Sequence, residues 1–475
     1  MVCPSLAAAN ALAPAPEAIE ALVEELRPLA SHDGLALIED PRERTRLSRD
    51  CFEYSPVLTP LLEACRADLV ARPSTVDQVM AVAGACARHR VPLTCRGAGT
   101  GNYGQCVPLA GGLVLDLSRL RGLLHWDGAQ GAATLGPGTL LAEADAALAA
   151  HGRALRLAPS TWRSATVGGF IAGGSGGIGS LRWGFLRDAG NLLGLEVVTL
   201  ESEPRRLQLD AAASEGLNHA YGCNGILTAV TLATCPAVAW QQLVVEFLDW
   251  EAALSAAREL PTTALELNAL CLLEAPLAAG LPGPSDCPPP QSGAHRLLLL
   301  AAPDTLAVLP RWLSRRGGTL VWQAPQGHSR GLPLRELTWN HTTLHWRAQH
   351  PEWTYLQLVL PQPEAAALAA LRDRWGTDLL FHLEGVRSGG AARLAALPLV
   401  RWRGATALEA LMAQVRDLGG VLFNPHVLTV EDGGLGVVDA DQVAAKSSFD
   451  PNGLLNPGKL RGWLERPGQL RDTQG

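Results

Sequence analysis

The stretch TCRGAGTGNYG, residues 94–104, places glycines at 97, 99, 101 and 104 directly after a strand-like segment. Its second half fits G-x-G-x-x-G, the pattern that holds dinucleotide phosphates in Rossmann folds, where a helix has to follow the glycines. The residues that follow here include Pro108, Gly111 and Gly112 and lead into the strand-like GLVLDL (112–117), so no helix fits. The loop therefore serves another fold, in which bare backbone approaches a partner closely.

A second glycine-rich stretch follows at PSTWRSATVGGFIAGGSGGIGSLRWG, residues 159–184. Its glycines at 168, 169, 173, 174, 176, 177 and 179 would be costly to order without a ligand or a closely packed backbone. Hydroxyl groups at Ser160, Thr161, Ser164 and Thr166 stand beside these amides. Two such loops with strands between them suit one long ligand that has a pyrophosphate in its middle.

The composition predicts a soluble chain of several domains. The 475 residues carry a net charge of -7, which argues against a nucleic-acid partner. The strongest apolar run, 297–302, is too short to span a bilayer, and no basic residue precedes Arg27 as a secretory signal would require. The ten cysteines contain no C-x-x-C pair and are interpreted as reduced thiols. We therefore expect a cytoplasmic protein without a membrane span.

Hydrophobic periodicity predicts a mixed chain of helices and strands. Around the first loop it indicates a helix from Ser74 to about His89 and strands over 91–95 and 112–117. Three strand-helix-strand rounds between 243 and 383 predict a second sheet with helices on one face. VLFNPHVLTV (421–430) is interpreted as one further strand.

The order of these motifs resembles the FAD-binding domain of the vanillyl-alcohol-oxidase superfamily of FAD-linked oxidases. Between residues 72 and 235 the chain runs through RPSTVDQV, VPLTCRGAGTG, GLVLDLSRL, ATLGPGTLLAE, the second glycine-rich stretch and GCNGILTAVTLAT, in that family's order. The tail FDPNGLLNPGKL (449–460) is similar to the ending of its glycolate-oxidase D-subunit and D-lactate-dehydrogenase branch. The resemblance rests on the order and spacing of these motifs.

The resemblance implies an α+β fold with a two-subdomain FAD-binding domain and a ferredoxin-like α+β cap. We assign residues 1–70 to an N-terminal arm with one helix, 71–238 to the FAD-binding domain, 239–420 to the cap and 421–475 to a segment that returns to the flavin. FAD would be bound non-covalently. Family members that tether it often use a histidine in the first loop, and residues 94–108 contain none.

The resemblance also implies which residues contact FAD. The first loop would wrap the pyrophosphate, the second would line the flavin and ribityl chain and cover the other side, and a later strand would bond near the cofactor. The cofactor-binding candidates are Arg96, Gly97, Ala98, Gly99, Thr100, Gly101, Pro159, Ser160, Thr166, Gly168, Gly169, Gly173, Gly176, Gly179, Ile226 and Thr228.

The implied activity is hydride transfer from a small hydroxy-acid or alcohol-type substrate to flavin N5, with a histidine accepting the proton. LTWNHTTLHWR (337–347) and FNPHVLTVEDGG (423–434) would face the flavin in this family. A lysine in the tail would reach the isoalloxazine, where a cation stabilises the charge of the reduced ring. The catalytic candidates are His341, His426, Asn424 and Lys459.

Two motifs of the D-2-hydroxy-acid branch are missing, a His-x-Gly-Asp-Gly-Asn-like stretch and a Glu-His pair that binds a metal beside the substrate. NPHVLTVEDGGLG (424–436) stands where that pair would be, so we predict no metal site. Two other functions stay open. One is a reductase of the same fold fed by NADPH. The other is a non-catalytic FAD-binding subunit of a larger complex, because glycolate oxidase has sister subunits.

Overall fold

A small sheet carries the first glycine-rich loop at the end of one of its strands. In the computed structural model, which describes residues 3–466, its order is β1–β2–β4–β3, and only β1 runs antiparallel to its neighbour. Buried leucines and valines of α2 and α5 pack against these strands. The elements are β1 (Ala36–Ile38), β2 (Leu69–Arg72), β3 (Leu93–Arg96), β4 (Leu113–Asp116), α2 (Pro16–His32) and α5 (Val76–Arg88).

A second, antiparallel sheet carries the other glycine-rich loop. Its order is β5–β6–β10–β8–β9, and β7 pairs with the end of β10. β5 and β6 form a hairpin. The loop at 104–112 contains no helix, as the sequence predicted. The elements are β5 (Leu123–Asp127), β6 (Ala132–Leu135), α6 (Leu141–Ala149), β7 (Arg153–Leu155), α7 (Val167–Gly173), α8 (Ser180–Trp183), β8 (Leu192–Val198), β9 (Arg206–Asp210), α9 (Ala211–Ser214) and β10 (Ile226–Pro236).

The N-terminal segment is more structured than the predicted arm with one helix. It adds β1 to the first sheet, and the Cys51 amide donates to the carbonyl of Gly101 at 2.7 Å in the first glycine-rich loop. It therefore helps to build the loop's surroundings. Its further helices are α1 (Pro4–Asn10), α3 (Pro41–Leu47), the 3-10 turn η1 (Phe52–Tyr54) and α4 (Thr59–Leu62), and residues 1–2 lie outside the described part.

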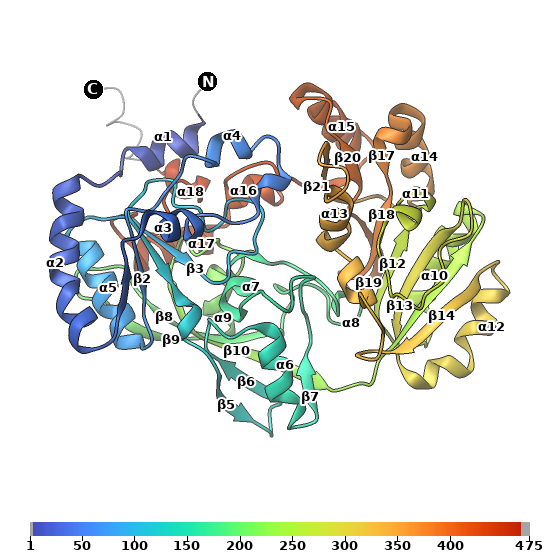
Figure 1. Ribbon diagram of the computed structural model, residues 1–475, viewed down its shortest axis with the longest axis horizontal. Coiled ribbons are helices and arrows are strands. Elements are labelled where there is room, and N and C mark those ends of the chain that lie inside the picture. Colours follow the sequence, from blue (N-terminus) through green and yellow to red (C-terminus); the bar gives the residue numbers. More distant parts are fainter. Residues whose placement is uncertain (1–2, 467–475) are drawn as a thin grey trace.

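Residues 241–423 form a separate lobe, which we call the cap (Figure 1). Its main sheet has the order β14–β11–β13–β12–β18–β19–β16–β21. Its strands are β11 (Gln241–Phe247), β12 (Leu267–Leu273), β13 (His295–Ala301), β14 (Thr319–Pro325), β16 (Gln357–Val359), β18 (His382–Ser388), β19 (Ala391–Ala396) and β21 (Val421–Phe423).

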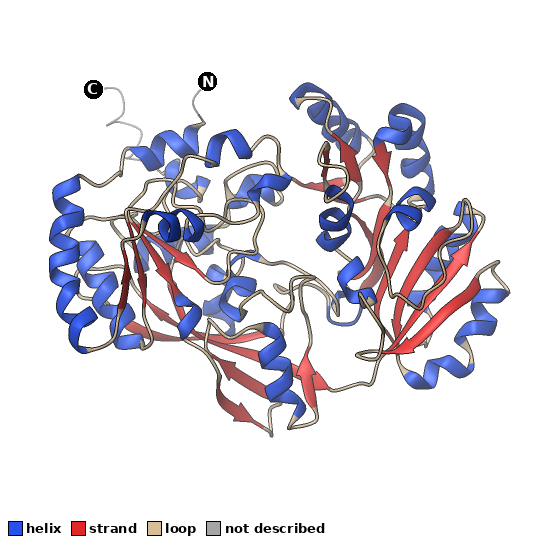
Figure 2. Ribbon diagram, in the orientation of Figure 1, coloured by secondary structure: helices blue, strands red, loops and turns tan. Residues whose placement is uncertain are grey.

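Helices cover both faces of the cap sheet, and the prediction of one covered face is wrong (Figure 2). The reason lies in strands such as β13, where Leu297 to Leu300 are all buried, so apolar side chains point to both sides. One face packs on α10 (Trp250–Glu259), α12 (Leu309–Ser314), α14 (Ala365–Trp375) and α15 (Ala405–Asp417). The other face packs on α11 (Ala275–Gly280), the 3-10 turn η6 (Leu334–Leu337) and α13 (Asn340–Arg347).

Two predicted cap strands are broken in the structure. The segment 354–360 divides into β15 (Trp353–Tyr355), which joins a small sheet with β20 (Leu399–Arg401) and β17 (Leu379–Leu380), and β16 in the main sheet. VLFNPHVLTV keeps only β21 as a strand. Pro425 cannot donate to a ladder, and the Asn424 side chain closes a turn by accepting the His426 amide at 3.0 Å.

The C-terminal segment returns from the cap to the first sheet, with α16 (Val430–Gly433), α17 (Ala440–Phe449) and α18 (Arg461–Leu464). The backbone of Leu455 bridges to Leu93 of β3. Buried Lys446 donates to the carboxylate of Asp450 at 2.5 Å and to the carbonyl of Leu455 at 2.6 Å. The part of the predicted segment at 467–475 lies outside the described residues.

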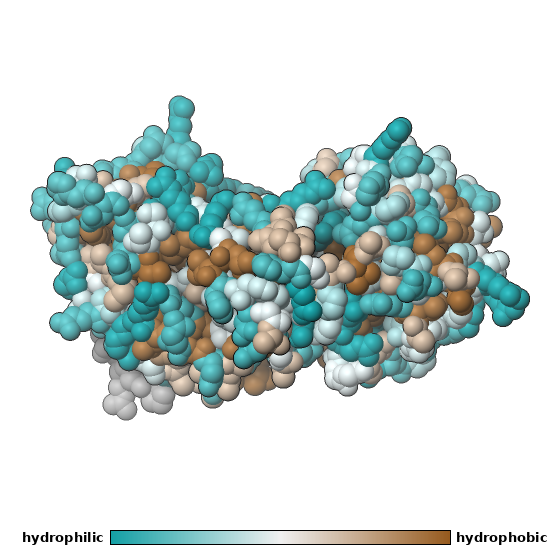
Figure 3. All heavy atoms as spheres, turned by 90° about the horizontal axis from the view of Figure 1, so that it is seen from below, coloured by the Kyte–Doolittle hydropathy of each residue, from teal (hydrophilic) through white to brown (hydrophobic). Residues whose placement is uncertain are grey.

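Within residues 3–466, no helix has the length and apolar character needed to cross a membrane. Figure 3 shows the two lobes from below, with apolar side chains scattered among polar ones.

Replacing Lys446 with methionine should lower the free energy of unfolding by about 3–5 kcal/mol, because Asp450 would keep a buried charge without its partner. The matched control is Arg46→Met, which removes the exposed ion pair with Glu43 and should cost less than about 1 kcal/mol. Urea denaturation of both variants measures the difference. Equal losses would show that the tail is not held by this pair.

Candidate functional site

The first glycine-rich loop presents a row of free backbone amides. The amides of residues 98–102 donate no hydrogen bond to another residue in the described part of the chain. Gly99 has φ +71°, and a Cβ there would clash with the guanidinium of Arg96. Consecutive free amides next to a positive-φ glycine form a cradle for an anion such as a pyrophosphate.

The second glycine-rich loop lies against the first. Thr166 caps α7 by accepting the amide of Gly169 at 3.2 Å, and a Cβ on Gly97 of the first loop would collide with this same hydroxyl. Gln105 of the first loop donates to the carbonyl of Gly173 at 3.3 Å. The structure thus brings together the two loops that the sequence predicted to share one ligand.

Several glycines of the second loop are needed for close backbone packing. A Cβ on Gly177 would strike the carbonyl of Ala158, and one on Gly179, which has φ +97°, would strike that of Arg156. Gly168 lies against Pro137 in the same way. Pro159, Ser160 and Gly176 belong to this packed segment, in which Ser160 is buried.

Three other cofactor-binding candidates contact other residues of the protein. Arg96 donates to the carbonyls of Arg49 and Ala98, so its guanidinium braces the loop from within. Thr228 donates to the carboxylate of Glu196 at 2.8 Å across the β10–β8 pair. Ile226 is buried in the apolar core beneath the first sheet.

Lys459 holds the first loop, whereas we expected it to reach the isoalloxazine. Its fully buried ammonium donates to the carbonyls of Gly104, Gln105 and Val107. Asn456 donates from the same tail to the carbonyl of Gln105 at 2.8 Å. The NPGK motif therefore holds the end of the first loop in place, and the ammonium of Lys459 already donates to three backbone carbonyls.

Asp50 of the N-terminal segment is a site residue that the sequence did not reveal. Its Oδ2 atom is buried beside Gly101 and has no hydrogen-bond partner among residues 3–466. Burial raises the pKa of Asp50 to about 7, against the charges of Lys459 and Arg96. No local pattern marks this aspartate, because the contact depends on how the N-terminal segment folds over the loop.

Helix α13 lies on the side of the cap that faces the FAD-binding lobe (Figure 1). At its C-terminal end Arg347 donates to the carbonyl of Tyr54 at 2.9 Å, next to the first loop. Before its N-terminal end, Glu336 pairs with Arg163 of the second loop at 3.1 Å. The helix carries both His341 and His345.

His341 of α13 lies beside a carboxylate. Its Nδ1 is 2.9 Å from Oε2 of Glu336, an ion-pair contact without hydrogen-bond alignment, and its side chain is 13% exposed. Burial alone would raise the pKa of Glu336, but His341 and Arg163 together hold it below its usual value. A histidine with one nitrogen held by a carboxylate can use the other to accept a proton.

His426 and Asn424 occupy structural positions. Both ring nitrogens of His426 are engaged, Nδ1 by the Ser55 hydroxyl at 2.8 Å and Nε2 by the carbonyl of Tyr355 at 3.0 Å. Burial lowers the pKa of His426 to about 4, so the ring is neutral near pH 7. With the Asn424 turn, these contacts hold the returning chain against the cap, and they leave no free nitrogen on His426 for a substrate.

A polar contact between the cap and the first loop was also missed. Asn102 donates to the hydroxyl of buried Tyr355 at 2.6 Å, and Tyr103 beside it is half-buried. Burial raises the pKa of Tyr103 to about 12. Asn102 and Tyr355 are 253 residues apart, so only the assembled fold brings them together.

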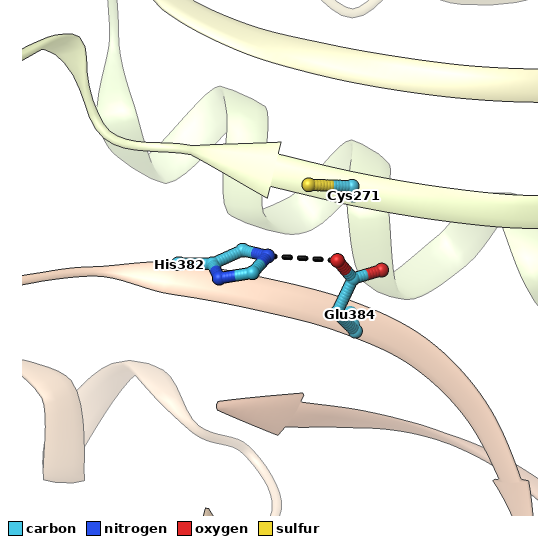
Figure 4. Close-up of side chains that lie close together, drawn as sticks. All are labelled: Cys271, His382 and Glu384. Atoms are coloured by element: carbon cyan, nitrogen blue, oxygen red, sulfur yellow. Dashed lines mark hydrogen bonds and ion pairs between the residues drawn. The ribbon is translucent and has the colours of Figure 1, made fainter. Parts of the chain in front are cut away.

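One group of side chains in the described part of the chain could hold a metal, Cys271, His382 and Glu384 (Figure 4). They lie on β12 and β18, on the sheet face that α13 covers. The sequence did not predict this group, because Cys271 is far from the His382-x-Glu384 pair in the chain and their spacing matches no known metal motif. The described residues therefore contain one candidate metal site, where the sequence predicted none.

Sequence comparisons place the glycine-rich loops in a known type of domain. Residues 67–208 match the family described as FAD binding domain. The chain is 26% identical to the glycolate oxidase subunit GlcD of Bacillus subtilis, over 86% of this chain and 91% of that protein. It is 33% identical to the GlcD subunit of Escherichia coli over 35% of this chain, a stretch that spans 34% of that protein. It is 32% identical to a D-lactate dehydrogenase of Archaeoglobus fulgidus, over 37% of this chain and 40% of that protein.

The fold is shared over nearly the whole chain with a solved structure. Alkyldihydroxyacetonephosphate synthase superposes with a TM-score of 0.72, over 94% of this chain and 85% of that one, at 15% identity. At this identity the likeness establishes the fold.

Replacing Gly99 with valine should yield folded protein without FAD, because the side chain would displace the Arg96 guanidinium that braces the cradle. Gly34→Val is the matched control. Gly34 has the same φ of +71° but open space around it, so it bears the backbone strain without blocking a ligand. Flavin absorbance per chain, with circular dichroism to verify folding, measures the outcome. Full FAD content in Gly99→Val would refute the cradle.

The amide row, the contact between the two loops and the closely packed glycines all fit a dinucleotide with a central pyrophosphate. The sequence relatives include a glycolate oxidase subunit and a D-lactate dehydrogenase, and the superposition extends over both lobes. The chain contains an FAD-binding domain, in residues 67–208, and shares the fold of alkyldihydroxyacetonephosphate synthase.

Proposed function

We propose that the protein oxidises a small hydroxy acid or alcohol with FAD as its redox cofactor. The observation that carries the proposal is the pair between Glu336 of η6 and His341 of α13, on the side of the cap that faces the FAD-binding lobe. Bound FAD supplies the hydride acceptor, flavin N5, for the carbon that bears the hydroxyl group. The protein's task is then to hold the substrate, orient it and remove the hydroxyl proton.

His341 is the proposed base. Glu336 is buried between Arg163 and His341, and its main-chain carbonyl accepts from Nε2 of His345 at 2.9 Å. With Nδ1 of His341 facing the carboxylate, Nε2 is the nitrogen left to take the proton. The nearby carboxylate also stabilises the imidazolium that forms.

The substrate class is drawn from the relatives. The names of the relatives refer to glycolate and D-lactate, both small 2-hydroxy acids, and two relatives are named as subunits. A partner subunit that accepts electrons fits these names, and a non-catalytic FAD-binding subunit is the competing function. Under that alternative, no substrate reduces the flavin of the isolated chain.

FAD should be bound without a covalent link. Thiolates are the nucleophilic form of cysteine, and burial raises the pKa of Cys95 to about 12 and also raises the pKa of Cys106. Together with the lack of histidine in residues 94–108, this leaves no activated nucleophile in the first loop. Acid precipitation should leave the yellow colour in the supernatant. A yellow pellet would show that a covalent bond exists.

His341→Gln should slow flavin reduction by about 10²–10⁴-fold, or roughly 3–5 kcal/mol, while FAD stays bound. His426→Gln is the matched control. It should reduce thermal stability and change the rate less than about tenfold, because both of its nitrogens already serve the fold. Anaerobic stopped-flow reduction, with a panel of hydroxy acids and alcohols, measures both rates.

Three outcomes separate the alternatives. A wild-type rate in His341→Gln would contradict the proposed base, and a large loss only in His426→Gln would move it to the returning segment. Reduction of the wild-type flavin by NADPH but by no alcohol or acid would favour the reductase. No reduction by any donor would favour the non-catalytic subunit.

A further inference from the structure

Cys271, His382 and Glu384 meet on one face of the cap sheet. β12 and β18 pair antiparallel, with Cys271 opposite Glu384 and Leu273 opposite His382. Because side chains two residues apart on a strand share a face, His382 and Glu384 both point to the side of Cys271. Figure 4 shows the sulfur beside the contact between the imidazole and the carboxylate. The sheet register therefore fixes all three side chains in one place.

These three side chains are buried and incompletely satisfied. Cys271 and His382 are fully buried and Glu384 is 1% exposed, and one ligand atom from each lies within 4.8 Å of the others. Nε2 of His382 contacts Oε1 of Glu384 at 2.7 Å. Nδ1 of His382 is buried with no hydrogen-bond partner among residues 3–466. The nitrogen that faces Glu384 and Cys271 is Nε2, so Nε2 is the atom that His382 would offer to a ligand held by the three side chains.

We infer that Cys271, His382 and Glu384 bind one zinc-type divalent cation. Thiolate, imidazole and carboxylate are the three ligand types of protein zinc sites. Soft sulfur beside nitrogen selects zinc over magnesium or calcium, which prefer all-oxygen ligands. One dication with one thiolate, one carboxylate and a neutral imidazole sums to zero charge, which is the condition for burying ions at low cost.

The thiol supports this assignment. Its Sγ lies within 4.8 Å of the ligand atoms of His382 and Glu384, so one cation can reach all three. A coordinating thiol is deprotonated, so metal binding would release the thiol proton and leave a neutral complex.

The cation would be structural and would fix the start of α13. Oε1 of Glu384 accepts the amide of Trp339 at 2.6 Å, and Trp339 is the residue that begins this helix, with φ +53°. The site therefore ties two cap strands to the helix that carries His341. Its burial keeps it from any substrate. Its ligands include neither the Glu-His pair nor the Gly-Asp-Gly-Asn stretch of the D-2-hydroxy-acid branch.

Metal content of the full chain tests the inference directly and does not depend on the proposed function. Untagged protein from zinc-supplemented cells, dialysed without chelator, should contain about one zinc per chain by mass spectrometry of the metal. Cys271→Ser and Glu384→Gln should each lower this content at least tenfold. Cys86→Ser is the matched control, because Cys86 is equally buried on α5, away from this group, and its loss should leave the zinc in place.

X-ray absorption at the zinc edge of the wild-type protein provides a readout that needs no variant. It should show one sulfur at about 2.3 Å and nitrogen or oxygen at about 2.0–2.2 Å. Wild-type protein with less than a tenth of an equivalent of metal, zinc without a sulfur neighbour, or full zinc in Cys271→Ser would each overturn the site. The group would then be a hydrogen-bonded cluster in the cap core.

Discussion

The FAD-binding half of the protein depends on keeping the amides of residues 98–102 unpaired. Backbone N–H groups usually find partners within a fold, and leaving several free in one loop requires that the loop be held from outside. The Lys459 ammonium supplies that hold by binding three carbonyls, and Cys51 binds the carbonyl of Gly101. The amides of residues 98–102 thus remain free to bind an anion, which we propose is the pyrophosphate of FAD.

The same constraint explains why distant segments converge here. The tail reaches the loop because Leu455 bridges to β3 and because the buried Lys446–Asp450 pair fixes the turn before it. The cap contacts the first loop through the hydrogen bond between Asn102 and Tyr355. It contacts the second loop through the ion pair between Arg163 and Glu336. These contacts hold the part of the cap that carries α13 against both loops. The proposed base His341 is thus positioned by both lobes.

The sequence could predict what local pattern encodes. Glycine spacing and the absence of a helix after Gly104 predicted both loops and excluded the Rossmann fold. It could not predict pairings across long separations, such as Asn102 with Tyr355 or Cys271 with Glu384, because no periodicity records them. The role of Lys459 at the isoalloxazine, which the family resemblance implies, stays a prediction. The residue is in the expected motif, but burial and three carbonyls decide what its charge does.

Hydrogen–deuterium exchange tests most directly whether the free amides of the first loop bind the cofactor. Deflavinated protein and protein reloaded with FAD should differ most in peptides that cover residues 97–104 and 160–177. FAD should slow exchange there at least tenfold, since these amides gain an acceptor. The β12 peptide, 267–273, should exchange equally slowly in both states. Unchanged exchange at 97–104, or equal protection across the whole chain, would show that the amides of the first loop do not bind the cofactor.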